Sequence, residues 1–472
     1  MNLEYLVYRL PKKSNRDQRK THMQQDFELQ AGTWKWGLLC LVFLAPFFFL
    51  SYGFANQYAD NLPYVGSIVF DWEHKIPLWP WTIVPYWSID LFYGLSLLLC
   101  WNRLELKQHA LRLFTAQLIA VSCFLLFPLK FSFDRPALDG FFGVWFDVLM
   151  GFDKPFNQAP SLHIVLLVIL WDFYRRHVVA PYKWIVDLWS FLIGLSVLTT
   201  WQHHFIDIPT GVLAGALCIW LFPFHVKAPY QADALQYRTS RHIRLASYYL
   251  FGALGLSFIA FYYASWTLWL LYPAVSLTIV GLAYLLVRPH FFQKQANGRL
   301  THAATLLLGP YLVMAWLNSR LWTKKHPEDS KILTYQSGNL YLGRIPTSSV
   351  AKNYTALFDC CAELPVHTEK HYQAYFSLDL IPLQPKQLKY AVRIFDDLVQ
   401  KSKAVEKPFE LLVFCALGYS RSTAILCAWL IDQNFARDQE DALRIVQTER
   451  PWVRLNIEQM QCLHDYAQKL EF

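Results

Sequence analysis

A cysteine and an arginine near the end of the chain have the types and the spacing that suit attack on a phosphate ester. An apolar run, ELLVFC, ends at Cys415, and Arg421 stands at the expected start of an amphipathic helix. A loop between a strand and a helix N-terminus points backbone N–H groups at an anion, and Gly418 permits a tight backbone there. Arg421 offers a planar clamp for phosphate oxygens, and the positive field favours the Cys415 thiolate as nucleophile. Ser422 is placed to donate to the sulfur when it leaves.

Three short polar segments interrupt the apolar first half of the chain. They are LKFSFDRP, APSLH and WQHHFID, and they contain Lys130, Arg135, Ser161, His163, His203 and Asp207. These types suit phosphoryl transfer through a phosphohistidine, in which cations offset the phosphoryl charge, one imidazole attacks phosphorus and a second protonates the leaving oxygen. The spacing of His203 and Asp207 would place them on one helical face, where the carboxylate can orient the ring. Basic residues at span ends often only reach toward water, but three such segments on one predicted side favour a site.

The composition shows what kind of elements must position these groups. Of 472 residues, 54% are hydrophobic and only 17% are charged, which is too apolar for one soluble domain and excludes a secreted, disordered or fibrous protein. Charge-poor runs long enough to cross about 30 Å of hydrocarbon occupy 35–55, 80–101, 111–129, 159–174, 184–201, 208–225, 245–264, 266–287 and 302–318. The net charge of +8 therefore fits basic loops against an anionic membrane face, with no nucleic-acid partner.

Loop charges predict how the chain is placed in the membrane. Basic residues precede the first run and recur in alternate loops, so the N-terminus is expected in the cytoplasm and the three polar segments on the opposite side. The run 302–318 contains Pro310 and has basic residues on both flanks. If it crosses, the C-terminus lies outside. We expect that it does not cross, because a thiolate nucleophile survives better in a reducing compartment.

The composition changes after about residue 320. Residues 330–472 predict a soluble α/β domain with strands at NLYLGRI and ELLVFC and helices over 385–402, 421–433, 439–448 and 456–470. We therefore expect a basic cytoplasmic segment over 1–30, a membrane phosphatase domain over 31–230, additional membrane segments over 231–320 and a phosphatase-like domain over 321–472. The fold class is a polytopic all-α membrane bundle followed by a soluble α/β domain.

The loop around Cys415 resembles the active-site loop of dual-specificity protein phosphatases. The resemblance extends over roughly 330–472, where GNLYLGRIPTS is similar to that family's opening strand and turn, and SLDLIPLQPKQLKYAVRIFDDL to the segment that bears its general acid. It implies Cys415 as nucleophile, Arg421 as phosphate clamp and Asp379 as proton donor, with Asp359, Asp396 and Asp397 as alternatives for the donor. Phe414 stands where the family usually has His.

The three polar segments resemble the signature motifs of the type 2 phosphatidic acid phosphatase superfamily. The resemblance implies a six-helix core in which His203 is the nucleophile, His163 the general acid and Asp207 the partner of His203, with Lys130, Arg135 and Ser161 as phosphate ligands and no metal or cofactor. The sequence departs from the family at Leu162, where Gly is usual, at Val197, where Arg is usual, and in the short spacing from Lys130 to Arg135. PSLH and HHFID look more like the inositol phosphorylceramide synthase branch, which transfers head groups between lipids.

These features predict an integral membrane enzyme with two phosphatase sites. The leading interpretation is hydrolysis of phosphomonoesters in a bacterial inner membrane, with a periplasmic histidine site acting on a phosphorylated lipid. The cytoplasmic cysteine site would act on a phosphoprotein or a second phospholipid. One alternative is head-group transfer at the membrane site, because hydrolysis and transfer share the phosphohistidine intermediate. Another is a regulatory C-terminal domain that binds phosphate without turnover, as the absence of the usual His at Phe414 suggests.

Overall fold

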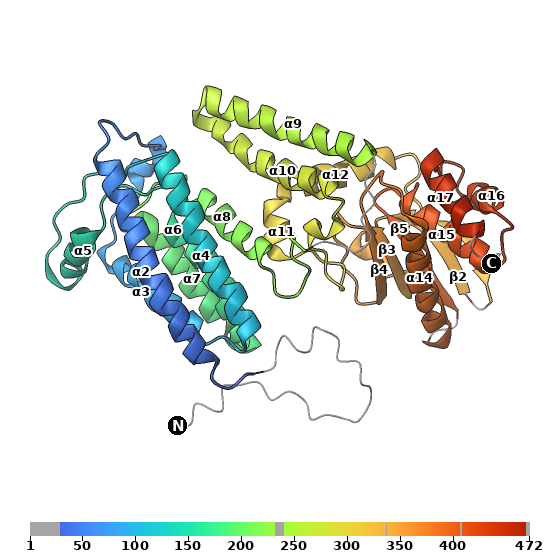
Figure 1. The fold of residues 1–472 in the computed structure, drawn as a ribbon, viewed down its shortest axis with the longest axis horizontal. Coiled ribbons are helices and arrows are strands. Elements are labelled where there is room, and N and C mark those ends of the chain that lie inside the picture. Colours follow the sequence, from blue (N-terminus) through green and yellow to red (C-terminus); the bar gives the residue numbers. More distant parts are fainter. Residues whose placement is uncertain (1–28, 232–239, 337, 406–407, 469–472) are drawn as a thin grey trace. The chain divides into compact units, whose positions relative to one another are not determined.

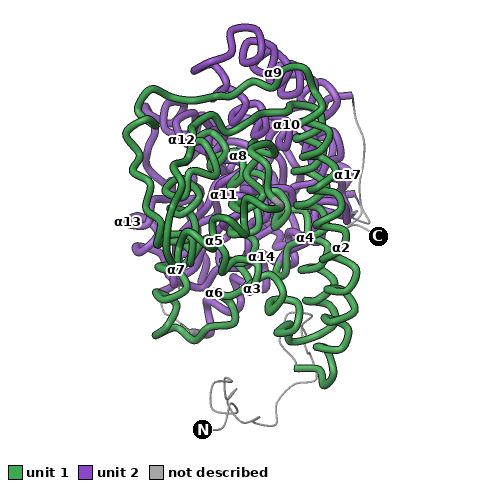
Figure 2. Tube along the Cα trace, turned by 90° about the vertical axis from the view of Figure 1, so that its left-hand side faces the viewer, with its two compact units in different colours: residues 1–225 green, residues 226–472 purple. Residues whose placement is uncertain are grey.

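The computed structural model describes residues 29–231, 240–336, 338–405 and 408–468. The chain forms two compact units, Met1–His225 and Val226–Phe472, which Figure 2 shows in different colours. The predicted basic segment over 1–30 lies almost wholly outside the described residues.

The first unit is helical. Its helices are α2 (Thr33–Asp60), α3 (Ile83–Leu98), α4 (Arg103–Leu126), α5 (Gly140–Phe152), α6 (Leu162–His177), α7 (Lys183–Thr199) and α8 (Asp207–Leu221) (Figure 1). Two glycines let α8 approach α6 closely: a Cβ atom would lie 2.8 Å from Ile164 Cβ at Gly211 and 2.8 Å from Val168 Cβ at Gly215. Small residues one helical turn apart are the usual way for apolar helices to pack this tightly. The contact brings the second and third polar segments together.

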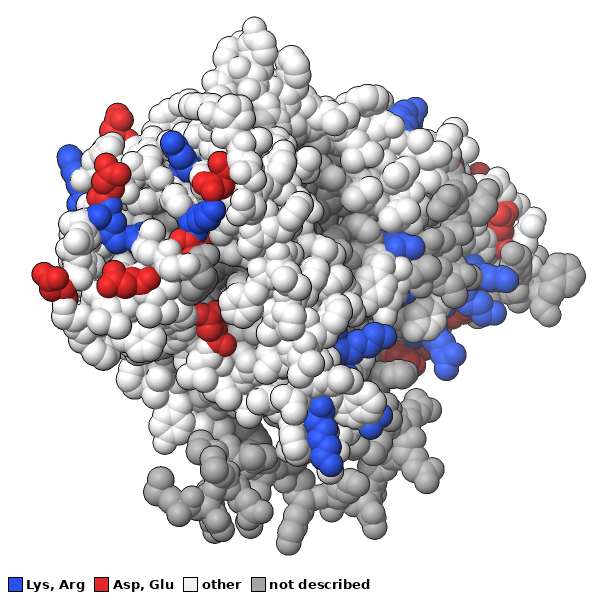
Figure 3. All heavy atoms as spheres, turned by 60° about the vertical axis from the view of Figure 1, so that its left-hand side comes forward, with Lys and Arg blue, Asp and Glu red and all other residues white. Residues whose placement is uncertain are grey.

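Five helices of the described chain are long and apolar enough to cross a membrane. They are Thr33–Asp60, Arg103–Leu126, Ala180–Thr199, Ser240–Tyr263 and Ser265–Leu285. Many of their apolar side chains are exposed, and Leu50 and Phe251 are 75% and 71% exposed. In the space-filling view, charged side chains are sparse over much of the visible surface (Figure 3). Water solvates such surfaces poorly, whereas lipid solvates them well.

Two segments differ from the sequence-based expectation. Residues 140–152 lie between two of the predicted apolar runs, yet they form α5, because GFFGVWFDVLMGF is an apolar stretch too short to be recognised as a span. The run 302–318 is broken at Leu308 into α11 (His302–Leu307) and α12 (Gly309–Trp322), with Pro310 in the first turn of α12. At about 1.5 Å per residue, neither piece is long enough to cross the hydrocarbon core.

The second unit begins with the helix pair α9 (Ser240–Tyr263) and α10 (Leu271–Leu285), followed by α11 and α12 and then a mixed sheet. The sheet order is β1-β2-β5-β3-β4, in which only β1 is antiparallel to its neighbour. The strands are β1 (Ser330–Tyr335), β2 (Gly338–Arg344), β3 (Ala356–Cys361), β4 (His371–Ser377) and β5 (Phe409–Cys415), and the helices are α13 (Ser348–Ala351), α14 (Pro385–Val405), α15 (Arg421–Asp432), α16 (Gln439–Glu449) and α17 (Ile457–Gln468).

Strand β5 lies in the middle of the sheet, and its carboxyl end is Cys415. The parallel register pairs Arg344 at the end of β2 with Cys415, so the carboxyl ends of these strands lie at one edge. Ligands bind at this edge in open α/β sheets. The predicted strands at NLYLGRI and ELLVFC and the four predicted helices of this domain lie on β2, β5, α14, α15, α16 and α17.

Several hydrogen bonds join the segment before the sheet to the phosphatase-like domain. The Lys294 ammonium donates to Asp359 Oδ2 at 2.5 Å and to the Cys361 carbonyl at 2.7 Å, and both charged side chains are buried. The Ser319 hydroxyl of α12 donates to the Ala416 carbonyl at 2.6 Å. Residues 289–323 are therefore bonded to the sheet and to the loop that follows β5.

Candidate functional site

The loop from Cys415 to Arg421 encloses the cysteine sulfur. The Gly418 N–H donates to Cys415 Sγ at 3.2 Å, and the Ser422 hydroxyl donates to the same atom at 3.3 Å. Gly418 has a φ of 71°, and a Cβ atom there would lie 2.3 Å from the Gly343 carbonyl oxygen. Only glycine fits this turn without moving the backbone. Two donors thus point at one buried sulfur.

Arg421 is the first residue of α15 and is held by carboxylates on both sides. Its Nη1 and Nη2 donate to the two oxygens of Glu363 at 2.8 and 2.6 Å. Its Nε lies 3.2 Å from Asp379 Oδ1, and Nη1 also donates to the Ser377 carbonyl at 2.9 Å. These contacts fix the orientation of the guanidinium plane at the start of α15.

Burial and mutual electrostatic interaction shift the pKa values of Glu363, Asp379 and Arg421. Burial alone would raise the pKa of Glu363, but the adjacent Arg421 guanidinium lowers it, so the glutamate stays ionised. The pKa of Asp379 is raised, because desolvation disfavours its charge more strongly than Arg421 favours it. Burial opposes the charge of Arg421, yet the two carboxylates raise its pKa well above the ordinary value. The pKa values of the two carboxyl groups beside Arg421 are thus shifted in opposite directions.

Only Asp379, among the four aspartates considered as proton donor, contacts Arg421. Asp359 is fully buried in β3 and pairs with Lys294. Asp396 accepts from the Trp429 indole at 3.1 Å, and Asp397 is exposed on α14. Asp379 therefore has the geometry that best suits a group acting near Cys415.

Three residues that were not predicted from the sequence support the loop and Arg421. Glu363 follows β3, a strand that was not predicted because all six of its residues are buried and its sequence therefore lacks an alternating pattern. Arg450, which is fully buried, donates through Nε to the Gly418 carbonyl at 3.1 Å. Ser319 holds the Ala416 carbonyl from α12. A buried Arg far along the chain carries no local signal of this kind, and only the tertiary structure reveals it.

The histidine group lies in the first unit. His203 Nδ1 is 3.2 Å from Asp207 Oδ2, and the same carboxylate oxygen accepts from the His204 N–H at 3.1 Å. The expected helical face is wrong, because residues 203–206 form a turn and α8 begins at Asp207. The Val197 carbonyl accepts the His203 N–H at 3.1 Å and so holds that turn.

The second polar segment joins the third through the backbone. The Ser161 N–H donates to the Asp207 carbonyl at 3.1 Å, and the Ser161 hydroxyl caps α6 by accepting from the Ile164 N–H. His163 stacks on Tyr86 with ring centroids 3.9 Å apart, and its Nε2 lies 2.9 Å from the Tyr86 carbonyl.

The cations of the first polar segment have different surroundings. The Arg135 guanidinium donates to the Trp201 carbonyl at 2.7 Å, two residues before His203. The Lys130 side chain is exposed, while its N–H donates to the Gly66 carbonyl. Arg135 therefore joins the histidine segment directly, whereas among the described residues the Lys130 ammonium has no such bond.

Two acidic residues near this group were not identified from the sequence. Glu73 Oε2 lies 3.1 Å from His204 Nδ1. Asp153 accepts from the Tyr52 hydroxyl at 3.1 Å, and burial raises its pKa although His203 and Arg135 oppose that rise. Both acids lie in segments expected to be loops, where isolated carboxylates are too common to stand out. Within the described ranges, no cluster of His, Cys, Asp and Glu is arranged to hold a metal ion.

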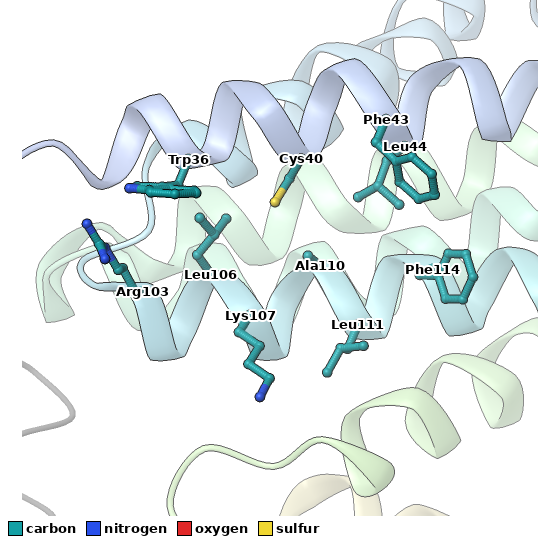
Figure 4. Close-up of a pocket in the computed structure, with 10 residues that line it drawn as sticks. All are labelled: Trp36, Cys40, Phe43, Leu44, Arg103, Leu106, Lys107, Ala110, Leu111 and Phe114. Carbon is teal, nitrogen blue, oxygen red and sulfur yellow. The ribbon is translucent and has the colours of Figure 1, made fainter.

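A groove between α2 and α4 has a volume of about 500 Å³ (Figure 4). Trp36, Cys40 and Phe43 of α2 face Leu106 and Phe114 of α4, and the guanidinium of Arg103 lies 4.9 Å from the Trp36 ring. Its lining contains none of the residues predicted to act in catalysis.

A central strand that ends in a buried cysteine, a loop closed by an arginine and a helix that starts at that arginine together define a cysteine-dependent phosphatase domain. Residues 340–469 match the family model described as dual specificity phosphatase, catalytic domain. The C-terminal domain is therefore a dual-specificity phosphatase domain, and the protein is a phosphoric monoester hydrolase.

Several solved structures are similar to this part of the chain. PTPMT1 in complex with PI(5)P is 15% identical, with 28% of this chain and 92% of that chain covered and a TM-score of 0.25. Human DUSP28 is 17% identical, with 30% and 97% covered and a TM-score of 0.26. The human tyrosine phosphatase-like serine/threonine/tyrosine-interacting protein is 17% identical, with 31% and 100% covered and a TM-score of 0.26. A comparison with curated proteins found no match.

Proposed function

We propose that the C-terminal domain hydrolyses phosphomonoesters through a phosphocysteine. In the first step the Cys415 thiolate attacks phosphorus, an S–P bond forms and the P–O bond to the leaving group breaks. Asp379 gives its proton to the leaving oxygen, while Arg421 and the loop N–H groups bind the phosphoryl oxygens.

The second step returns the enzyme to its starting state. Asp379, now a carboxylate, accepts a proton from a water molecule that attacks phosphorus. The S–P bond breaks, inorganic phosphate leaves, and the Ser422 hydroxyl donates to the departing thiolate. The observation that carries this proposal is the grouping of Cys415 Sγ, its two donors, Arg421 and the half-buried Asp379 at one edge of the sheet.

The test is turnover of p-nitrophenyl phosphate by the purified full-length protein in detergent. We expect hydrolysis that Cys415→Ser abolishes and that Cys462→Ser, in α17, leaves unchanged. A wild-type protein that binds vanadate yet releases no phosphate would instead support the regulatory interpretation and refute turnover.

A second function is proposed for the first unit, because His203 and Asp207 are paired and Ser161 is bonded to the Asp207 backbone. There His203 attacks the phosphorus of a phosphorylated lipid and Asp207 orients its ring. His163 protonates the leaving oxygen, with Lys130, Arg135 and Ser161 as phosphate ligands. The six-helix core of type 2 phosphatidic acid phosphatases is part of this proposal.

The lipid site is tested by asking whether two single variants each lose a different activity. His203→Ala and Cys415→Ser are assayed separately in full-length protein against phosphatidate and p-nitrophenyl phosphate. His203→Ala should remove only the phosphatidate activity, and Cys415→Ser should leave that activity in place. A new phosphodiester lipid in place of free phosphate would favour head-group transfer, and phosphatidate turnover that survives His203→Ala would refute the histidine site.

For the membrane, we propose a bacterial inner membrane with the histidine site in the periplasm and the C-terminal domain in the cytoplasm. The alternation of basic loops and the break at Leu308 support this placement. An alkaline phosphatase fusion at residue 330 should be inactive, and strong activity of that fusion would overturn it.

A further inference from the structure

A cavity of about 490 Å³ in the second unit connects the phosphatase loop to the apolar helices before the sheet. Its polar end is lined by Glu363, Asp379 and Asn318, together with Ala416 and Leu417 of the loop that follows Cys415. The remaining lining includes Leu380 and side chains of α9, α10 and α12, among them Tyr249, Leu277, Tyr284, Tyr311, Met314 and Ala315. One cavity thus joins charged groups beside Arg421 to a largely hydrocarbon wall.

The residues of α10 that line the cavity show how far it extends along the helix. Pro273 and Tyr284, which both line the cavity, are separated by three turns of α10, or about 16 Å at 1.5 Å per residue. One leaflet of a bilayer has about 15 Å of hydrocarbon. The cavity therefore extends along α10 over a length similar to that of a lipid tail in one leaflet.

The surroundings of the cavity are those of a membrane interface. α9 and α10 belong to the helices that are long and apolar enough to cross a membrane, and α12 exposes Val313, Met314 and Trp316. The rings of Tyr249 and Tyr284 stack at 5.4 Å, and Tyr311 meets Tyr249 edge-on at 6.0 Å. Tyrosine is favoured where the hydrocarbon meets the polar zone, because one end of the side chain is apolar and the other is polar.

The helices are bonded to the catalytic domain at the polar end. Arg241, at the start of α9, lies 3.2 Å from Glu458 of α17. Ser319, which follows Asn318 in α12, holds the Ala416 carbonyl, and the Tyr419 hydroxyl donates to the Trp322 carbonyl at 3.1 Å. The cavity and the loop are thus parts of one bonded structure.

From the continuity of this cavity with the Cys415 loop, we infer that the cysteine site takes a phosphomonoester with a hydrocarbon tail, a phosphorylated membrane lipid, whose tail lies between α9, α10 and α12. The inference rests on the proposed hydrolysis at Cys415. The order of the lining matches the order of such a molecule, since the phosphate would meet Arg421, the head would lie near Asp379 and Asn318, and the tail would contact Leu277 and Met314. A phosphorylated protein side chain has no hydrocarbon tail that would fill an apolar cavity beginning beside the proton donor.

The test uses a series of n-alkyl phosphates from butyl to decyl phosphate, together with p-nitrophenyl phosphate and a phosphotyrosine peptide. All are assayed with the full-length protein at substrate concentrations below micelle formation. We expect kcat/KM to rise about two- to fourfold with each methylene that enters the cavity. Phosphate release is measured for all substrates in the same detergent.

Two pairs of variants separate the cavity from general apolar effects. Ala315→Phe fills the cavity from α12 and should flatten the dependence of kcat/KM on chain length, whereas Val313→Phe, on the same helix but outside the lining, should keep it. Leu277→Trp and Val275→Trp form the matching pair on α10 in case Ala315→Phe fails to fold, and thermal unfolding of each variant reports its folding.

The outcomes distinguish the inference from the function on which it rests. If p-nitrophenyl phosphate is hydrolysed but chain length has no effect, or if Ala315→Phe and Val313→Phe behave alike, the tail site is refuted and hydrolysis stands. If the phosphotyrosine peptide is the best substrate and ignores both filling variants, a protein substrate replaces the lipid. If no monoester is hydrolysed, the proposed function fails and the inference fails with it.

Discussion

Substituting Gly418 with Ala gives the sharpest test of the cysteine loop. At a φ of 71°, an L side chain costs about 1–2 kcal/mol of backbone strain. The new Cβ would lie 2.3 Å from the Gly343 carbonyl oxygen, and contacts below 3.0 Å essentially never occur, so the loop must move by at least about 0.7 Å. A displacement of about 1 Å in a catalytic group can cost about 100-fold in rate. We therefore expect Gly418→Ala to lower kcat/KM for p-nitrophenyl phosphate by about 30- to 100-fold.

The matched control is Gly298→Ala. Gly298 has a φ of 80°, so the substitution introduces a similar strain, but its nearest atoms are the Val366 carbonyl oxygen at 3.1 Å and the Tyr372 ring. It should lower the temperature of unfolding without changing kcat/KM by more than about threefold. If Gly418→Ala stays folded and also remains within threefold of wild type, the close packing of the loop against Gly343 does not set the geometry of the site.

Three further predictions follow from buried charges. Desolvation raises the pKa of Asp379, and a general acid must be protonated, so kcat/KM for hexyl phosphate should fall as the pH rises through that raised pKa. The Asp379→Asn variant should lose this fall in kcat/KM at high pH. If its pH profile equals that of the wild type, Asp379 is not the acid. Glu363→Gln removes the negative charge that balances Arg421 and places an amide N–H donor against one guanidinium N–H donor. We therefore expect kcat/KM for p-nitrophenyl phosphate to drop at least about tenfold. Lys294→Met should lower the free energy of unfolding of the second unit by about 3–5 kcal/mol, because it leaves the Asp359 charge unpaired. Denaturant unfolding should show that the double variant Lys294→Met/Asp359→Asn regains part of this free energy. An equal loss in the single and the double variant would contradict a buried ion pair.

The sequence was most informative where a local pattern and its chemistry coincide. The run ELLVFC followed by a glycine loop and an arginine predicted a strand, a turn and a helix in that order, and these are β5, the loop and α15. The apolar runs were likewise long enough to predict helices from length alone, and the helices α2 to α4 and α6 to α10 lie on them.

Other features depend on contacts that no local pattern encodes. Strand β3 is buried on both faces, as expected for a strand inside a mostly parallel sheet, so its sequence ALFDCC shows no alternation. Glu363 and Ser319 act on Arg421 and Ala416 from segments far away in the chain. The pairing of His203 with Asp207 agrees with their spacing, but a turn held by the Val197 carbonyl produces it instead of a helix.

The buried bond between Lys294 and Asp359 and the bond from Ser319 to Ala416 bear on where the catalytic region can be excised from the chain. A recombinant fragment that starts at residue 321 would lack both Lys294 and Ser319, leaving a carboxylate stranded in the sheet interior and the carbonyl next to Cys415 without its donor. A truncated enzyme prepared in this way would be inactive for reasons unrelated to its chemistry. The shortest fragment worth expressing starts at about residue 289, and it includes helix α12, whose apolar side chains Val313, Met314 and Trp316 are exposed.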